Sequence, residues 1–273
     1  MKQLDRFKEY LAEEEKSRLT QEKYLRDARK FLVWLGERTL SKQEVLAFKS
    51  ELLESYAISS VNSMLSSINC YFSFCGRDDC KVKFVKQQRE IFCSEEKELT
   101  RGEYERLLYV AKGDSRLCLL MQTICSTGIR VSEHPFITVE AICQGKATVR
   151  CKGKTRTVLL PKKLCRALKS YVKQHGIKSG SIFITKTGKP LDRSRIWAQM
   201  KKLCRTAKVL AEKVFPHNLR HLFARMYYAI EKDIVRLADI LGHASINTTR
   251  IYTKESGEVH RRQIEKMPFL FIT

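Results

Sequence analysis

The segment HNLRHLFARMYYAI at residues 217–230 decides how the surrounding chain folds. Its apolar residues recur at the i, i+3 and i+4 spacing of an amphipathic helix. His217 and Arg220 stand three residues apart, so this helix would present an imidazole and a guanidinium on one face. We therefore expect it to carry half of an anion-binding site. Its apolar stripe consists of Leu219, Leu222, Phe223, Met226 and Tyr227.

Two short motifs after this segment supply further reactive groups. The motif LGH at 241–243 contributes a second imidazole from His243, and TTRIYT at 248–253 contributes Tyr252 nine residues later. Two helical turns with a short break between them would return the Tyr252 hydroxyl towards His217 and Arg220. Proton carriers and cations gathered around one phenol suit an anionic centre that a tyrosine attacks.

An earlier motif, TGIRVSE at 127–133, supplies a second guanidinium from Arg130 at the start of a predicted helix. A second guanidinium matters because a phosphodiester has two non-bridging oxygens, and planar guanidinium groups bind such oxygens in pairs. We interpret Glu133 as a supporting carboxylate that orients a neighbouring cation. An ordinary charge in the first turn of a helix is the alternative interpretation of Glu133.

Together these motifs resemble the tyrosine recombinases, the phage-integrase and Xer-like family of site-specific DNA recombinases. The pattern of that family is Arg, Lys, His-x-x-Arg, His and Tyr in this order, and the resemblance here spans most of residues 99–260. Five positions of the pattern match directly, at Arg130, His217, Arg220, His243 and Tyr252.

The lysine of the family pattern lies on a β-hairpin between the first arginine and the His-x-x-Arg motif. CKGKTRTVLLP at 151–161 has the character of such a hairpin. The resemblance therefore implies Lys152 as the general acid, with Lys154 in reserve.

One departure from the family pattern follows Glu133, where His134, Pro135 and Phe136 replace the usual leucine-rich continuation. It touches none of the matched positions. His134, like His175 and His260, has no partner pattern, and we expect all three at the surface. We expect His221 to be packed or exposed to solvent rather than catalytic.

The charge of the chain points to a polyanionic partner. Its 273 residues suit one large or two ordinary domains, and the formal net charge is +22. Residues 1–92 carry 17 Lys and Arg against 14 Asp and Glu, whereas residues 93–273 carry 35 against 16. The basic excess therefore lies in the second part of the chain, which favours nucleic acid.

The ten cysteines include no CxxC pair, and we interpret them as reduced, mostly buried thiols of a cytoplasmic protein. His217 and His221 have the spacing of a zinc helix, but Asn218 occupies the place of the glutamate in HExxH. We therefore expect no metal and no other cofactor. Signal-peptide and membrane-spanning patterns are absent.

The predicted fold class is mainly α with a small β-sheet (α+β), in two domains. Residues 1–76 read as four amphipathic helices, with Thr20 and Ser41 as candidate caps. This bundle resembles the SAM-like core-binding domain that such recombinases place on the DNA. Residues 77–98 read as a linker, and residues 99–273 as the catalytic tyrosine-recombinase domain. In that domain we expect strands over 142–160 and 182–185, and helices near 162–175, 192–207 and 235–241.

The resemblance implies a DNA strand transferase that forms a 3′-phosphotyrosyl intermediate. Its partner would be double-stranded DNA with a specific recombination site, bound by a tetramer on two duplexes, with an accessory or directionality factor in addition. Because one ester replaces another, the step conserves bond energy and can be reversed. The chain accordingly has no P-loop, and it has no carboxylate cluster that would hold magnesium.

Two alternatives remain open from the sequence. A type IB topoisomerase uses nearly the same constellation of residues, although the LGH motif and the compact length favour a recombinase. A DNA-binding relic of a recombinase would keep the basic surface but lose catalytic residues, and here every position of the pattern has a candidate residue.

Overall fold

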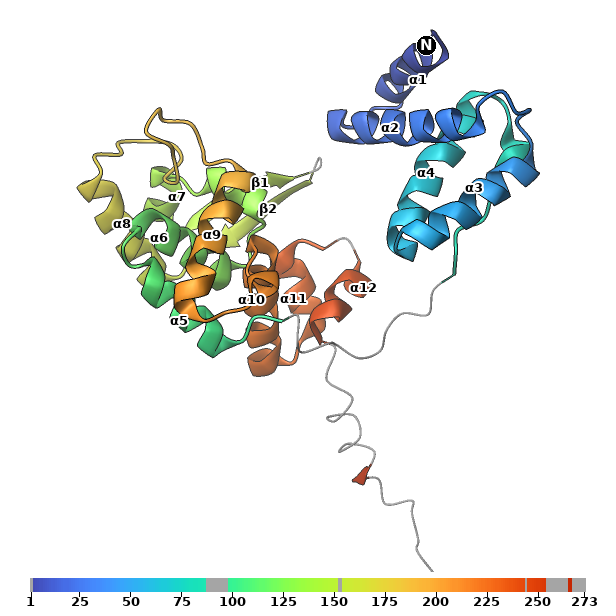
Figure 1. Ribbon diagram of the computed structural model, residues 1–273. Helices are drawn as coiled ribbons and strands as arrows, with labels where there is room; N and C mark the ends of the chain where they lie inside the picture. The colour runs from blue at the N-terminus through green and yellow to red at the C-terminus, as the bar shows by residue number, and fades with distance from the viewer. Residues whose placement is uncertain (1, 87–97, 152–153, 244, 254–264, 267–273) are drawn as a thin grey trace, which may run out of the picture. The chain divides into compact units, whose positions relative to one another are not determined.

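The computed structural model describes residues 2–86, 98–151, 154–243, 245–253 and 265–266. The chain forms two compact units, Met1–Arg89 and Glu90–Thr273, each with its own hydrophobic core. Helices dominate both units, and the described strands form a single two-stranded sheet in the second (Figure 1). The predicted fold class is therefore confirmed.

The first unit is a bundle of four helices, α1 (Lys2–Glu13), α2 (Arg18–Leu35), α3 (Lys42–Ser55) and α4 (Ile58–Phe74). Ser41 caps α3 as predicted, but the cap of α2 is Ser17, and Thr20 lies inside the helix. The apolar stripes meet in a core rich in aromatic rings, where the edges of Phe48 and Phe72 pack against Phe31. This face-to-edge packing adds to the stability gained by burying the rings.

The chain after α4 continues to pack on the bundle. A 3₁₀ turn, η1 (Asp78–Cys80), buries Cys80, and Val82 is buried just after it. The side-chain amide of Asn69 bonds both the N–H and the carbonyl of Val82, at 3.1 and 2.9 Å. Asn62 holds Val85 in the same way, at 2.8 and 3.0 Å. The expected linker thus begins with residues that are fixed to the bundle.

One polar network lies inside the bundle. The carboxylate of Asp27, 3% exposed, accepts hydrogen bonds from Lys23 at 2.6 Å and from Ser67 at 2.8 Å. Lys23 also donates to the carbonyl of Ser63 at 3.0 Å. Each buried polar group here has a partner of complementary charge or hydrogen-bonding capacity, which offsets the cost of removing it from water.

The second unit is built around one helix, α10 (Pro216–Glu231), which contains the 217–230 segment. It packs against α6 (Ser115–Thr127) on one side and against α11 (Ile234–Leu241) and the turn η5 (Arg250–Thr253) on the other (Figure 1). The other helical segments are α5 (Arg101–Ala111), η3 (Val131–Phe136), α7 (Val139–Gln144), α8 (Lys162–Gln174), α9 (Arg193–Ala207), η4 (Ala211–Lys213) and α12 (Ile246–Thr249).

The hairpin of the second unit joins β1 (Lys146–Cys151) to the antiparallel strand β2 (Lys154–Leu159), with Cys151 paired to Lys154. It is shorter than predicted, because residues 142–144 belong to α7, which Thr138 caps and Gly145 ends. The strand predicted over 182–185 is absent from the described secondary structure, which has only isolated bridges at Ser181 and Ile184.

The departure at residues 134–136 forms part of η3. His134 is buried there at 3% exposure, so the prediction of a surface residue was wrong. Its Nδ1 lies 2.6 Å from the carbonyl of Val131, and its ring lies 6.4 Å from that of Phe183. Burial lowers the pKa of His134. The imidazole therefore fills the core as a neutral ring.

Candidate active site

Two glycines in left-handed conformation bring distant motifs to α10. Gly128 ends α6 at φ +65°, and a Cβ there would come within 2.5 Å of the Phe223 ring on α10. Gly242 ends α11 at φ +64°, and its Cβ would come within 2.3 Å of Cδ of Arg156 on β2. Both positions therefore require glycine twice over, for backbone conformation and for space.

Arg220 joins these two helix ends. It is fully buried and donates hydrogen bonds to the carbonyl of Gly128, to that of Leu241 at 2.8 Å and to Nε2 of His243 at 2.9 Å. Tyr252 lies close enough to raise the pKa of Arg220, against the larger effects that lower it. Burial, and then the charge of Arg130, lower the pKa of Arg220 to about 10, so it remains a cation at neutral pH.

These contacts determine the tautomer of His243. Because Arg220 only donates, Nε2 of His243 is an acceptor, and its Nδ1 carries the proton and donates to Oγ1 of Thr249 at 2.8 Å. Burial, followed by the charges of Arg220 and Arg130, lowers the pKa of His243 to about 4. His243 is therefore neutral at pH 7, and it can take up a proton only at Nε2, when Arg220 releases that nitrogen.

Tyr252 lies on η5 and is 5% exposed. It packs in a small cluster of its own with Ala224, Leu237 and Leu241. Its ring stacks on that of His243 at 5.8 Å and meets the edge of His221 at 4.7 Å. The structure thus brings the predicted tyrosine, both predicted histidine motifs and Arg220 to one place.

His221 is a neighbour of Tyr252 that we did not expect at the site from the sequence. Its ring lies 4.6 Å from His217 and 4.7 Å from Tyr252. Burial, and then the neighbouring cations, lower its pKa to about 3. Of the two expected settings, packed or exposed to solvent, the structure shows the first, and the packing is against the tyrosine. Its i, i+4 spacing from His217 is the sequence signal that could have indicated this position.

Glu133 forms ion pairs with two arginines of the site, Arg130 and Arg156. It is 1% exposed, and its carboxylate accepts from the backbone N–H and the guanidinium of Arg130, at 2.8 and 3.1 Å, and from Arg156 at 2.7 Å. Arg156 also donates to the carbonyl of Ile240 at 2.6 Å. Arg156, a residue the sequence analysis missed, therefore links the hairpin to the LGH motif and to Arg130.

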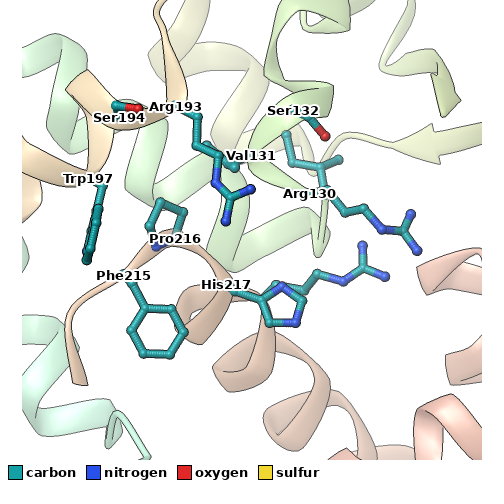
Figure 2. A pocket seen from close by; sticks show the side chains of 11 residues that line it. Arg130, Val131, Ser132, Arg193, Ser194, Trp197, Phe215, Pro216 and His217 are labelled. Carbon is teal, nitrogen blue, oxygen red and sulfur yellow. The ribbon is translucent and has the colours of Figure 1, made fainter. Parts of the chain in front are cut away.

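A cavity of about 590 Å³ opens where these groups converge. Arg130, which directly precedes η3, points into it together with Arg193 of α9 and His217 of α10 (Figure 2), and Arg220 lines it as well. Desolvation by the surrounding residues, and then the charges of Arg220, Arg130 and Arg193, lower the pKa of His217. The cavity lining includes no carboxylate.

Lys152 lies outside the described residues. Lys154 begins β2, and its backbone pairs with Cys151. In the part of the chain that the structure describes, no group of three or more His, Cys, Asp or Glu residues could hold a metal ion. No described helix is long and apolar enough to cross a bilayer.

The charge of this arrangement fits a phosphoryl centre. Arg130, Arg156 and Arg220 with Glu133 carry a net charge of +2, and the nearby histidines are neutral. A pentacoordinate phosphorane formed from a phosphodiester has two negative charges. Preorganised donors of this kind stabilise charge that develops in a transition state.

Comparison with known proteins agrees with this geometry. Residues 97–258 match the phage integrase family, and residues 4–78 match the N-terminal SAM-like domain of phage integrases. The tyrosine recombinase XerA of Pyrococcus furiosus is 31% identical over 276 residues, which cover 98% of this chain and 94% of that protein.

Solved structures share the fold. A lambda integrase fragment in a dimer bound to a COC′ core site has a TM-score of 0.76 and 17% identity, over 100% of this chain and 99% of that one. Lambda integrase in a tetramer bound to a Holliday junction has a TM-score of 0.73 and 18% identity, over 92% and 76% of the two chains.

Proposed function

The chain belongs to the phage integrase family, and we propose that it cuts and rejoins DNA at a specific site through a 3′-phosphotyrosyl bond to Tyr252. It is a site-specific recombinase, a DNA strand-transferring enzyme, and the topoisomerase alternative is not favoured. The observation that carries the assignment of Tyr252 is that its ring stacks at 5.8 Å on that of His243, which Arg220 holds together with the end of α6.

In this mechanism the Tyr252 oxygen attacks the scissile phosphorus. Its proton passes to a neutral imidazole of the pair His217 and His243. Arg130 and Arg220 bind the non-bridging oxygens and neutralise the charge that builds up on the phosphorane. Glu133 holds Arg130 in place, with Arg156 on the other side of its carboxylate. Attack by the 5′ hydroxyl of a second strand reverses the step.

The nucleophile is tested by replacing one oxygen. Tyr252→Phe should bind DNA but form no covalent adduct on a nicked suicide duplex, which a denaturing gel would detect. Tyr228→Phe, on α10 beside the same small cluster, is the matched control and should form the adduct. An adduct formed by the Tyr252→Phe protein would place the nucleophile elsewhere.

The proton for the departing 5′ oxygen is assigned to Lys152, on its match to the family lysine. Lys152→Ala should slow cleavage by roughly 10²–10⁴-fold, the usual contribution of a general acid. A duplex with a 5′-bridging sulfur should restore the rate, because a thiolate leaves without a proton. Lys154→Ala is the control, and a larger defect rescued by sulfur in that variant would make Lys154 the acid.

Double-stranded DNA and other copies of the chain are the partners that this function requires. We infer a tetramer on two duplexes, which is how lambda integrase is seen on a Holliday junction, with an accessory or directionality factor in addition. The net charge of +19 on residues 93–273 supports most of the phosphate contacts coming from the second unit.

A further inference from the structure

The cavity at the candidate active site is larger than one phosphate requires. Its volume of about 590 Å³ lies in the range of pockets that enclose a drug-sized molecule. Arg130, His217 and Arg220 occupy one side of the lining, and residues of α9 occupy another. The scissile phosphate accounts for the first side only.

Arg193 is the cation that the reaction leaves unused. The cluster of Arg130, Arg156, Arg220 and Glu133 already has the +2 charge that matches a phosphorane. Arg193 points into the same cavity (Figure 2), yet it forms no ion pair among the residues that the structure describes. A cation without a counter-ion beside a completed anion site indicates a second anion.

The neighbouring carboxylate does not neutralise Arg193. Asp192 caps α9, and its Oδ1 accepts the backbone N–H of Ser194 at 2.8 Å. Backbone hydrogen bonds in this turn lower the pKa of Asp192 and keep its charge fixed on the helix end. The guanidinium of Arg193 is therefore available, whereas the helix end is already capped.

The remaining lining of this side suits a sugar. Trp197 lies one turn after Arg193 on α9 and is 49% exposed, and Phe215 and Pro216 continue the apolar wall. Ser194 adds a hydroxyl next to Arg193. A guanidinium beside an apolar wall fits the alternation of phosphate and deoxyribose along a DNA strand.

We propose that Arg193, with Ser194 and Trp197, forms a subsite for the sugar–phosphate adjoining the scissile phosphate on the same strand. Arg193 binds the oxygens of that neighbouring phosphate, and Trp197 packs on its deoxyribose. The subsite fixes the register of the strand, so that the correct phosphorus lies in front of Tyr252. This inference rests on the proposed function.

The test measures affinity in a protein that cannot cut. Duplexes that bind the Tyr252→Phe protein are selected from a randomised pool, and the wild-type protein then maps the scissile position. In the Tyr252→Phe background, Arg193→Gln should weaken binding roughly 10- to 100-fold, as expected for a charged hydrogen bond. It should also reduce the slope of log affinity against log salt by about 0.9.

Arg195→Gln is the matched control. Arg195 lies two residues further along α9, is exposed and does not line the cavity, so the same change in net charge should alter affinity little. Equal losses in the two variants would show a general effect of charge and would overturn the subsite.

Neutral phosphates then locate the contact. Each phosphate near the scissile position is replaced in turn by an uncharged methylphosphonate. At one phosphate next to the scissile position, the replacement should strongly weaken DNA binding by the Tyr252→Phe protein. At the same phosphate it should hardly change binding by the protein that also carries Arg193→Gln. The same pattern at the scissile phosphate itself, or at no neighbouring phosphate, would contradict the proposal. The affinities and salt slopes are measured on the Tyr252→Phe protein and need no adduct, whereas the wild-type protein is used only to map the scissile position. If the wild-type protein forms no adduct on the selected duplexes, the proposed function is refuted; if it does and Arg193→Gln behaves like Arg195→Gln, only the subsite is refuted.

Discussion

The two units treat their buried polar atoms in opposite ways. In the bundle, Asp27 is surrounded by the donors Lys23 and Ser67. Among the described residues, seven buried side-chain nitrogen and oxygen atoms lack a hydrogen-bond partner, and all seven belong to the second unit. Two of them are Nε atoms of Arg156 and Arg220 at the candidate active site. The described part of the bundle thus satisfies its buried polar side chains internally, whereas the second unit leaves two guanidinium donors at the candidate active site without a partner.

This difference has a cost in the free protein. A buried donor without a partner destabilises the fold by about 1–3 kcal/mol, and more when the group is charged. A ligand that binds only the folded state recovers stability by mass action. The second unit, which holds the excess of cations, should therefore depend on polyanions for stability more than the bundle does.

The largest expected effect comes from the central cation of the second unit. Arg220→Lys keeps the charge but cannot reach Gly128, Leu241 and His243 together, because an ammonium lacks the fork of a guanidinium. Adduct formation in a single turnover should fall about 10²–10³-fold, as it does when one oxyanion donor is removed. Near-normal cleavage by this variant would show that the buried guanidinium of Arg220 is not needed for the reaction.

A smaller effect is expected from the corresponding charge in the bundle. Asp27→Asn leaves Lys23 without its counter-ion and should cost about 1–3 kcal/mol of unfolding free energy, with no change in cleavage. Urea unfolding would be followed by fluorescence of Trp34 in a Trp197→Phe background, because each unit holds one of the two tryptophans. Asp27→Leu with Lys23→Met should recover most of the loss, since neither charge is then left alone. A cleavage defect in Asp27→Asn would show that the network does more than stabilise.

The smallest expected effect is the loss of stability at acidic pH. It should be confined to the second unit, because all six histidines lie between residues 134 and 260. The folded pKa values of His221 and His243 lie below the ordinary value of 6.5, so the unfolded chain binds more protons between those values. Stability is therefore complete above pH 6.5 and falls as pH drops towards about 4 and 3. For His221 the loss is at most about 1.4 kcal/mol per pH unit.

Each tryptophan would report this acid response in its own unit. Trp197 in a Trp34→Phe protein should show a lower urea midpoint at pH 5.5 than at pH 7. Trp34 in the Trp197→Phe protein should show a smaller change. Equal changes in both reporters would contradict the assignment of the effect to the histidines.

Local patterns in the sequence were sufficient for most elements. The apolar stripes predicted the bundle helices and α10, and Ser41 caps α3 as expected. These features depend on residues within a few positions of each other. The site residues Arg130, His217, Arg220, His243 and Tyr252 lie together in the structure, although their catalytic roles stay predictions.

Features that depend on distant contacts were not predictable in this way. His134 is buried because Phe183, 49 residues further along the chain, packs beside it. Arg156 was read only as part of a hairpin, since its partners Glu133 and Ile240 are 23 and 84 residues away. The segment 182–185 has the composition of a strand, but in the described structure it pairs only through an isolated bridge between Ile184 and Pro190.

Gly242 of the LGH motif is subject to two independent constraints, one on its backbone and one on the space around it. Asparagine tolerates a left-handed backbone better than most residues, but its Cβ would still collide with Arg156. Loss of Arg156 would make room for a Cβ at position 242, but the left-handed backbone there would still disfavour a residue with a side chain. Selection must relax both constraints before the glycine can drift. A position held by two independent constraints is expected to change slowly over evolutionary time.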